Sequence, residues 1–263
     1  MKQRTLFSSS IIHSYIIIII ILFSILTRIT FCSVDPNFEA CKPQTCGNGQ
    51  NISYPFYIKG KQEPFCGYPK FELTCDHNGF PILNTSRTQY IVDEICYDSQ
   101  SLRVSIPAFS KPNTTECVAP LHNFSQYSRR FSVASMQKEV LLFQGCDSRS
   151  ILQGMKDIMI MCYGENKTSS VVALYREDPK LSIAYEKCKG GVVSTRVEDD
   201  KGGIEDALKR GFVLNWTASS CDECKSSGGR CGFDQDPHIY AFRCYCPDKV
   251  QSLICDDALT QPG

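Results

Sequence analysis

Residues 41–75 of the chain read CKPQTCGNGQNISYPFYIKGKQEPFCGYPKFELTC. Four cysteines, a cluster of aromatic residues and several prolines and glycines share this stretch. Aromatic residues favour β-strands, whereas proline and glycine mark the turns between strands. The stretch therefore predicts a small β-domain of short strands, which disulfide bonds hold together if the protein folds in an oxidising compartment.

Short alternating runs of apolar and polar residues continue this pattern toward the C-terminus. In the first half of the chain they predict strands over residues 89–92 and 101–106. In the second half they predict strands over residues 130–133, 140–143, 157–162, 170–175 and 191–197.

One short helix is predicted over residues 204–210. Asp206 lies in its first turn and Lys209 and Arg210 lie near its end, so their charges complement the helix dipole. Gly211 is expected at the C′ position that terminates the helix.

The length that remains after removal of a signal peptide suits two small domains better than one. We expect a mainly β, disulfide-rich fold with two small cysteine-rich domains and one short helix in the second. The predicted division is a signal peptide over 1–32, a first domain over 33–117, a connector over 118–129, a second domain over 130–255 and a tail over 256–263.

The N-terminus has the features of a secretory signal peptide. Lys2 and Arg4 supply positive charge, residues 16–26 are apolar, and Thr30 and Cys32 place small residues before a cleavage site. The alternative is an uncleaved membrane anchor, because the preceding residues lengthen the apolar stretch. No later run reaches the ~18 apolar residues of a membrane span. We expect a protein secreted to the extracellular space or cell wall, bound to a membrane only if the N-terminal segment is retained.

Asn-x-Ser/Thr sequons support the same compartment. Six of the nine asparagines lie in sequons, which are glycosylated only in the secretory pathway. The predicted N-glycosylation sites are Asn51, Asn84, Asn113, Asn123, Asn166 and Asn215.

The chain contains sixteen cysteines, and fifteen remain if Cys32 leaves with the signal peptide. This density predicts a disulfide framework in a secreted protein, although spacing alone does not fix the pairing. The cysteines expected in disulfides are Cys41, Cys46, Cys66, Cys75, Cys117, Cys146, Cys162, Cys188, Cys221, Cys224, Cys231, Cys244 and Cys246.

The densest cysteine motif lies between Cys221 and Cys246. A Cys-x2-Cys pair within it is also compatible with a zinc half-site or a redox pair. A zinc ribbon needs a second such pair, whereas here the partner is Cys244-x-Cys246. We therefore expect structural disulfides, with Gly228 and Gly229 allowing a tight turn between them.

The net charge and the motifs that the sequence lacks reduce the range of possible functions. The formal net charge is zero, so the chain lacks the positive field that nucleic acid binding needs. The sequence has no Gly-x-Ser-x-Gly elbow, no HExxH motif and no phosphate-binding loop. Carboxylates are plentiful, so composition alone does not exclude a glycosidase pair, but no spacing singles one out. We expect no enzyme activity, no cofactor and no metal site.

Lysines alternate with aromatic residues between residues 41 and 70, giving this stretch a local charge of +3. Aromatic rings can stack on sugar rings and lysines can pair with carboxylates of an acidic glycan. The competing interpretation places each aromatic ring in the core of a small β-domain. The candidate ligand-binding residues are Lys42, Tyr54, Phe56, Tyr57, Lys59, Lys61, Tyr68 and Lys70.

Two sets of motifs carry a family resemblance. The first set is CxxxxCG over 41–47, ISYPF over 52–56 and CGYPKFELTC over 66–75. It resembles the galacturonan-binding domain of plant wall-associated receptor kinases. The second set, GFVLNW over 211–216, CDEC over 221–224, SGGRCG over 227–232 and FRCYC over 242–246, is similar to their C-terminal module. In this order the two resemble the ectodomain of leaf-rust-resistance-type receptor-like kinases.

The resemblance implies binding of homogalacturonan, the acidic backbone of pectin, in the plant cell wall. It also implies a membrane span and a cytoplasmic kinase, which are missing from this sequence, so we expect a receptor-like ectodomain without kinase activity. Calcium could bridge protein and pectate carboxylates, although no calcium loop is present. Cys96 and Cys255 depart from the family pattern, and they could bridge to each other or to a partner.

A rival hypothesis is a secreted protein-interaction module, either a decoy or a co-receptor that binds a receptor kinase ectodomain. Disulfide-bonded β-domains with exposed loops suit this function equally well. Insensitivity of binding to salt and to pectin methyl-esterification would favour it. Protease inhibition is a third option, but no loop between cysteines is singled out for it.

Overall fold

The computed structural model describes residues 15–20, 34–85, 88–110, 130–146, 159–164, 167–198, 202–236, 239 and 241–255. Residues 15–20 are helical, and the rest of the expected signal peptide lies outside the described residues. The expected connector and the tail over 256–263 also lie outside them. None of the helices in the described part of the chain is long and apolar enough to cross a membrane.

The largest sheet has seven strands in the order β1-β2-β3-β4-β5-β11-β6. β1 and β2 are parallel, and every other neighbouring pair in this sheet is antiparallel. Its strands are β1 Tyr57–Ile58, β2 Glu72–Cys75, β3 Pro81–Asn84, β4 Gln89–Cys96, β5 Ser101–Ser105, β11 Phe212–Trp216 and β6 Phe131–Val133.

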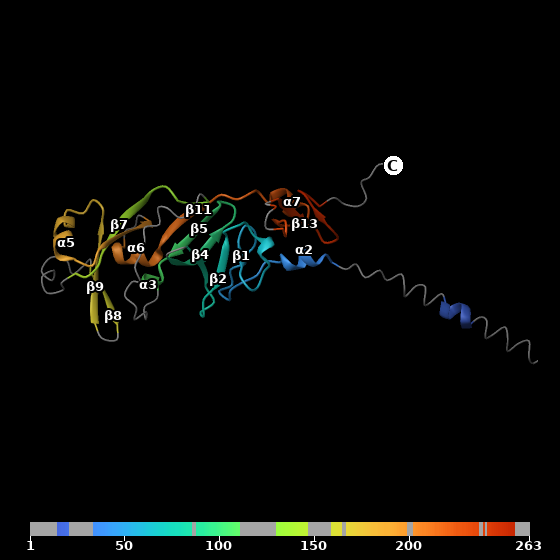
Figure 1. Cartoon of the computed structure of the whole chain (residues 1–263), viewed down its shortest axis with the longest axis horizontal. Coiled ribbons are helices and arrows are strands. Elements are labelled where there is room, and N and C mark those ends of the chain that lie inside the picture. The colour runs from blue at the N-terminus through green and yellow to red at the C-terminus, as the bar shows by residue number, and fades with distance from the viewer. Residues whose placement is uncertain are drawn as a thin grey trace, which may run out of the picture.

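Two smaller sheets lie at opposite ends of the molecule (Figure 1). The four-stranded sheet has the order β10-β7-β9-β8 and the three-stranded sheet has the order β12-β13-β14. Their strands are β7 Gln137–Phe143, β8 Met159–Gly164, β9 Lys167–Tyr175, β10 Val192–Glu198, β12 Arg230–Phe233, β13 Phe242–Tyr245 and β14 Val250–Gln251. The expected mainly β, disulfide-rich fold is confirmed.

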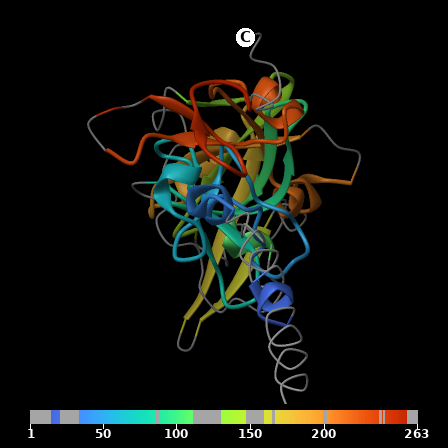
Figure 2. The same cartoon turned by 90° about the vertical axis from the view of Figure 1, so that its right-hand side faces the viewer.

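The helices are short, and α6 packs its buried side chains into the main hydrophobic core. They are α2 Pro36–Ala40, the 3-10 turn η1 Pro64–Cys66, α3 Pro107–Ser110, α5 Leu181–Lys187, α6 Ile204–Arg210 and α7 Asp222–Ser226. The three-stranded sheet lies beside α2, so residues near both ends of the described chain meet at one end of the molecule (Figures 1 and 2).

The expected helix over residues 204–210 is confirmed as α6. Gly211 ends it with φ 73°, and a Cβ there would lie 1.9 Å from the carbonyl oxygen of Val104. Position 211 therefore requires glycine for two reasons, the positive φ of the turn and the close approach of β5. The second half of the chain also forms α5 and α7, so the expectation of one helix there was too low. α5 has no acidic residue in its first turn and no glycine as its C-cap, and α7 has only five residues, so neither shows the full set of signals that marked α6.

The large sheet contains strands from both of the expected domains. β5 pairs with β11, and their residues Leu102 and Leu214 are partners that are both fully buried. Trp216 of β11 packs edge-on against Phe56, with ring centroids 5.0 Å apart. One hydrophobic core therefore spans residues on both sides of the expected connector.

Six disulfides are formed among the described residues. They are Cys41–Cys66, Cys46–Cys75, Cys146–Cys188, Cys221–Cys231, Cys224–Cys244 and Cys246–Cys255. Cys96 has a free thiol, so the suggested bridge between Cys96 and Cys255 was wrong. Cys117 lies outside the described residues. The Cys221–Cys246 motif consists of structural disulfides, as expected.

Candidate functional site

Three of the four candidate lysines gather at the edge of the large sheet. β1 is the edge strand, and Lys59 and Lys61 follow it directly. The Lys61 Nζ donates to the carbonyl oxygen of Thr45 at 2.7 Å, and Lys42 lies three residues before Thr45. Lys42, Lys59 and Lys61 are exposed and are called the lysine cluster below.

Lys70 lies apart from the lysine cluster. It precedes β2, which runs parallel to β1 with Tyr57 opposite Glu72, so Lys70 is at the start of this pair and Lys59 is at its end. The Lys59 Nζ lies 3.2 Å from the Glu72 Oε1 in an exposed ion pair. Exposed pairs of this kind contribute about 0–1 kcal/mol, so Lys59 can exchange Glu72 for another carboxylate at little cost.

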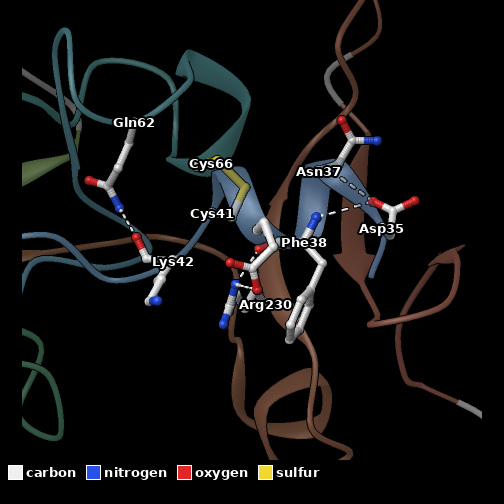
Figure 3. A network of polar contacts seen from close by, with 9 residues as sticks. Asp35, Asn37, Phe38, Cys41, Lys42, Gln62, Cys66 and Arg230 are labelled. Carbon is white, nitrogen blue, oxygen red and sulfur yellow. Dashed lines mark hydrogen bonds and ion pairs between the residues drawn. A yellow bond between two sulfur atoms is a disulfide. The ribbon is translucent and has the colours of Figure 1, made fainter. Parts of the chain in front are cut away.

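Gln62 fixes the backbone beneath the lysine cluster, and no motif in the sequence marks it for this role. Its buried side chain accepts a hydrogen bond from the Ile58 N–H at 2.9 Å. Its Nε2 donates to the carbonyl oxygen of Lys42 at 3.0 Å (Figure 3). It also lies 3.4 Å from the carbonyl oxygen of Ile52. One amide therefore ties together the two chain segments that carry the lysines.

The C-terminal part of the chain supports the same region. The Arg230 guanidinium lies 3.7 Å from the ring centroid of Phe38 and also donates to the Phe38 carbonyl oxygen (Figure 3). The Asp35 side chain caps α2 by accepting from the Asn37 N–H at 2.8 Å, and the Cys41–Cys66 disulfide follows α2. Residues preceding the lysine cluster are therefore held by β12.

Most of the candidate aromatic residues belong to the core. Phe56 is fully buried between Phe71 and Trp216, and this packing leaves no ring face for a sugar. Tyr54 is buried and its hydroxyl donates to the Ser219 carbonyl oxygen at 3.1 Å. Burial raises the pKa of Tyr54, so the phenol stays protonated.

Tyr57 and Tyr68 are also committed to contacts within the protein. Tyr57 is 9% exposed and its hydroxyl donates to the Glu72 Oε2 at 3.1 Å. Burial, and then the neighbouring charge of Glu72, raise the pKa of Tyr57 to about 12. The half-buried Tyr68 ring has the Arg130 guanidinium 4.6 Å from its centroid. The lysines therefore offer more to an external ligand than these rings do.

A groove of about 310 Å³ opens between the β4–β5 turn and the segment that leads from β11 into α7. We call it the junction groove. Its polar lining includes Asp98, Gln100, Ser219, Ser220, Asp222 and Lys225, and Tyr97 is part of the same lining. Sequence reasoning missed this site, because its two walls are more than a hundred residues apart in the chain and contain no motif of their own.

Hydrogen bonds hold Tyr97 in the junction groove. Its hydroxyl accepts from the Ser53 N–H at 2.9 Å and lies 3.3 Å from the carbonyl oxygens of Asn51 and Ser53. Burial raises the pKa of Tyr97. The Lys225 Nζ lies 5.4 Å from the centroid of the Tyr97 ring, within the range of a cation–π contact.

A cysteine group is the only place among the described residues where His, Cys, Asp or Glu atoms are close enough to hold a metal ion. It consists of Cys244, Cys246 and Cys255. All three sulfurs belong to disulfides, and a disulfide sulfur is not the thiolate that a metal binds.

Three predicted glycosylation sites lie within the described residues. The side chains of Asn51, Asn84 and Asn215 are all exposed, as a glycan would require. Asn113, Asn123 and Asn166 lie outside the described residues. Glycosylation of all six remains a prediction.

The fold and these sites define a disulfide-stabilised β module with exposed polar surfaces suited to binding. Two family models match the chain. The wall-associated receptor kinase galacturonan-binding model matches residues 41–106, and the wall-associated receptor kinase C-terminal model matches residues 146–249. The chain therefore carries both of these domains, in this order, and the domains are those of a wall-associated receptor ectodomain.

Curated relatives agree with this assignment. The chain is 38% identical over 225 residues to the leaf rust 10 disease-resistance locus receptor-like protein kinase-like 1.2 of Arabidopsis thaliana, covering 82% of this chain and 33% of the relative. It is 27% identical over 246 residues to the kinase-like 2.5 protein of that series and organism, covering 84% and 35%. The chain therefore spans about a third of the length of these relatives. No solved structure matches it.

Proposed function

We propose that this protein is an extracellular receptor-type ectodomain that binds the galacturonan backbone of pectin in the plant cell wall. The observation that carries the proposal is that the exposed lysine cluster lies inside the segment matched by the galacturonan-binding model. Its ammonium groups would pair with carboxylates of successive galacturonate units.

The geometry supports an ionic mode of binding. The three lysines are exposed beside the edge strand β1, whereas the neighbouring aromatic rings are packed inward. Contacts between exposed charges are weak and are screened by salt, so affinity for a single short oligomer should be modest. A polymer that presents many carboxylates would raise the apparent affinity through multivalency.

The test is calorimetric titration of the secreted protein with de-esterified oligogalacturonides, with fully methyl-esterified oligomers as the comparison. We expect saturable binding that weakens with salt and with esterification. The double substitution Lys59→Glu and Lys61→Glu should reduce the affinity for oligogalacturonides about tenfold or more, because two attractive charges become repulsive. The free energy of unfolding should change by less than about 1 kcal/mol, since only exposed contacts are lost.

The matched control is Lys189→Glu together with Lys209→Glu, which makes the same change in net charge elsewhere. Lys209 forms an exposed ion pair with Glu205 at 2.8 Å, as Lys59 does with Glu72. Affinity for oligogalacturonides should be unchanged in the control. If both double variants lose affinity equally, net charge rather than the lysine cluster determines binding.

A receptor ectodomain is the second candidate partner. Tyr185 is 54% exposed, and its ring centroid lies 4.9 Å from that of Phe143. Val192 is 41% exposed and is the cross-strand partner of Phe143. This small apolar surface lies at the end of the molecule remote from the lysine cluster (Figure 1). Absence of galacturonide binding, with protein binding that is insensitive to salt and esterification, would favour this function.

A further inference from the structure

We propose that the junction groove is a second ligand site, and that it binds an uncharged sugar unit. The groove is separate from the lysine cluster, and the inference does not depend on the proposed galacturonan binding. Its volume of about 310 Å³ is at the small end of the range of ligand pockets, about 300–1,000 Å³. This size suits one or two sugar rings rather than a longer oligomer.

The charges of the groove lining, two carboxylates and one ammonium group, sum to −1, so they disfavour an anionic ligand more than an uncharged one. The lining contains two carboxylates, those of Asp98 and Asp222, and one ammonium group, that of Lys225. A galacturonate unit would meet the carboxylates, whereas a cationic side chain would meet Lys225, which already lies over the Tyr97 ring. An uncharged ligand avoids both repulsions.

The polar groups of the groove complement sugar hydroxyls, which both donate and accept hydrogen bonds. Carboxylates accept, the Lys225 ammonium donates, and the Gln100 amide and the serine hydroxyls can do either. Ser220 and Asp222 are already oriented, because the Ser220 hydroxyl lies 2.8 Å from the Asp222 Oδ2. The part of the Tyr97 ring that Lys225 does not cover adds apolar lining for the C–H groups of a sugar ring.

The walls are fixed from both sides, which lowers the entropic cost of binding. The Trp216 N–H donates to the Gln100 carbonyl oxygen at 2.9 Å, and the Tyr54 hydroxyl donates to that of Ser219. The Cys221–Cys231 disulfide holds the start of α7. A groove between two chain segments that are joined in this way keeps its shape without a ligand.

The experiment is saturation-transfer NMR on the secreted full chain with three uncharged disaccharides, galactobiose, arabinobiose and xylobiose, and with digalacturonate as the anionic comparison. We expect saturable binding of at least one uncharged disaccharide, insensitive to salt and not displaced by digalacturonate. Ser219→Trp should reduce this affinity about tenfold or more by filling the groove. Ser182→Trp, on the exposed surface of α5, is the matched control and should leave it unchanged.

Two double variants test the charge selection and the independence of the groove from the lysine cluster. Asp98→Asn with Asp222→Asn keeps the shape and polarity of the groove but removes its negative charge, so digalacturonate should then compete. Lys59→Glu with Lys61→Glu should leave binding of the uncharged disaccharide unchanged, whatever happens to galacturonan binding. The inference is overturned if none of the three disaccharides binds, if Ser219→Trp binds as well as wild type, or if digalacturonate remains excluded from the double Asn variant.

Discussion

Phe56 shows, at the scale of single residues, how burial decides what an aromatic side chain can do. Its sequence neighbours are lysines and tyrosines, a composition that suits sugar binding as well as a core. The structure gives Phe56 an exposed fraction of 0% and places it against Phe71 and Trp216. The composition fits both a core ring and a sugar-binding ring. Only the tertiary contact with Trp216, which is far away in the chain, distinguishes the two.

Replacing Phe56→Ala should lower the free energy of unfolding by about 3–5 kcal/mol, because it leaves a cavity in the core. Chemical denaturation of the purified protein measures this change. Phe80→Ala is the control: Phe80 is 37% exposed, so its loss should cost only about 1–2 kcal/mol.

Phe56→Leu keeps most of the buried volume, so it can replace the alanine variant in this test if that variant is not secreted. Its loss of stability should be smaller than that of Phe56→Ala. Wild-type stability of Phe56→Ala combined with loss of oligogalacturonide binding would show instead that Phe56 contacts the ligand.

At the scale of elements, α7 and β13 depend on two disulfides that pack against each other. The Sγ atoms of Cys244 and Cys255 belong to different disulfides and lie 3.7 Å apart. Gly229 faces them, and a Cβ there would lie 2.4 Å from the Cys244 Sγ and 2.8 Å from the Cys255 Sγ. Gly229 is therefore glycine because the sulfurs leave no room for a side chain.

Gly229→Ala should hinder formation of the Cys224–Cys244 and Cys246–Cys255 disulfides. We expect a lower yield of secreted protein and additional free thiols, counted by alkylation and mass spectrometry. Gly228→Ala is the comparison, because Gly228 has φ 81° but a Cβ there would meet no atom within 4 Å. That change should cost about 1–2 kcal/mol through its backbone conformation alone, without free thiols. Equal thiol counts in the two variants would contradict the steric explanation.

The strands were easier to predict than the helices. The strand expected over residues 89–92 lies within β4, and the one expected over 140–143 lies within β7, because alternation of apolar residues reports burial on one face. α7 has five residues and follows a disulfide-bonded cysteine, so local propensity contributes little to it. The lysine cluster could be proposed from charge, whereas Gln62 and the junction groove depend on contacts between distant segments.

At the scale of the whole molecule, β11 connects the two halves of the chain. It pairs with β5 on one side and with β6 on the other. The Asp35 N–H also donates to the Pro247 carbonyl oxygen at 2.7 Å, which joins the two ends of the described fold. Sequence periodicity cannot reveal such pairings, because any strand of suitable pattern could occupy the position next to β5.

This arrangement predicts that the segment 33–117 does not fold alone. Without β11, β5 becomes an exposed edge, and Leu102 and Phe56 lose the buried partners Leu214 and Trp216. When it is expressed alone with a signal peptide, the segment should be retained in the cell, or it should be released but lack a cooperative unfolding transition. Co-secretion of 33–117 with 118–255 should restore a soluble complex, because the pairing of β5 with β11 does not require a continuous chain. A single cooperative transition of 33–117 alone would show that the expected domain boundary also separates two folding units, and that β11 only adds a strand to a sheet that is already stable.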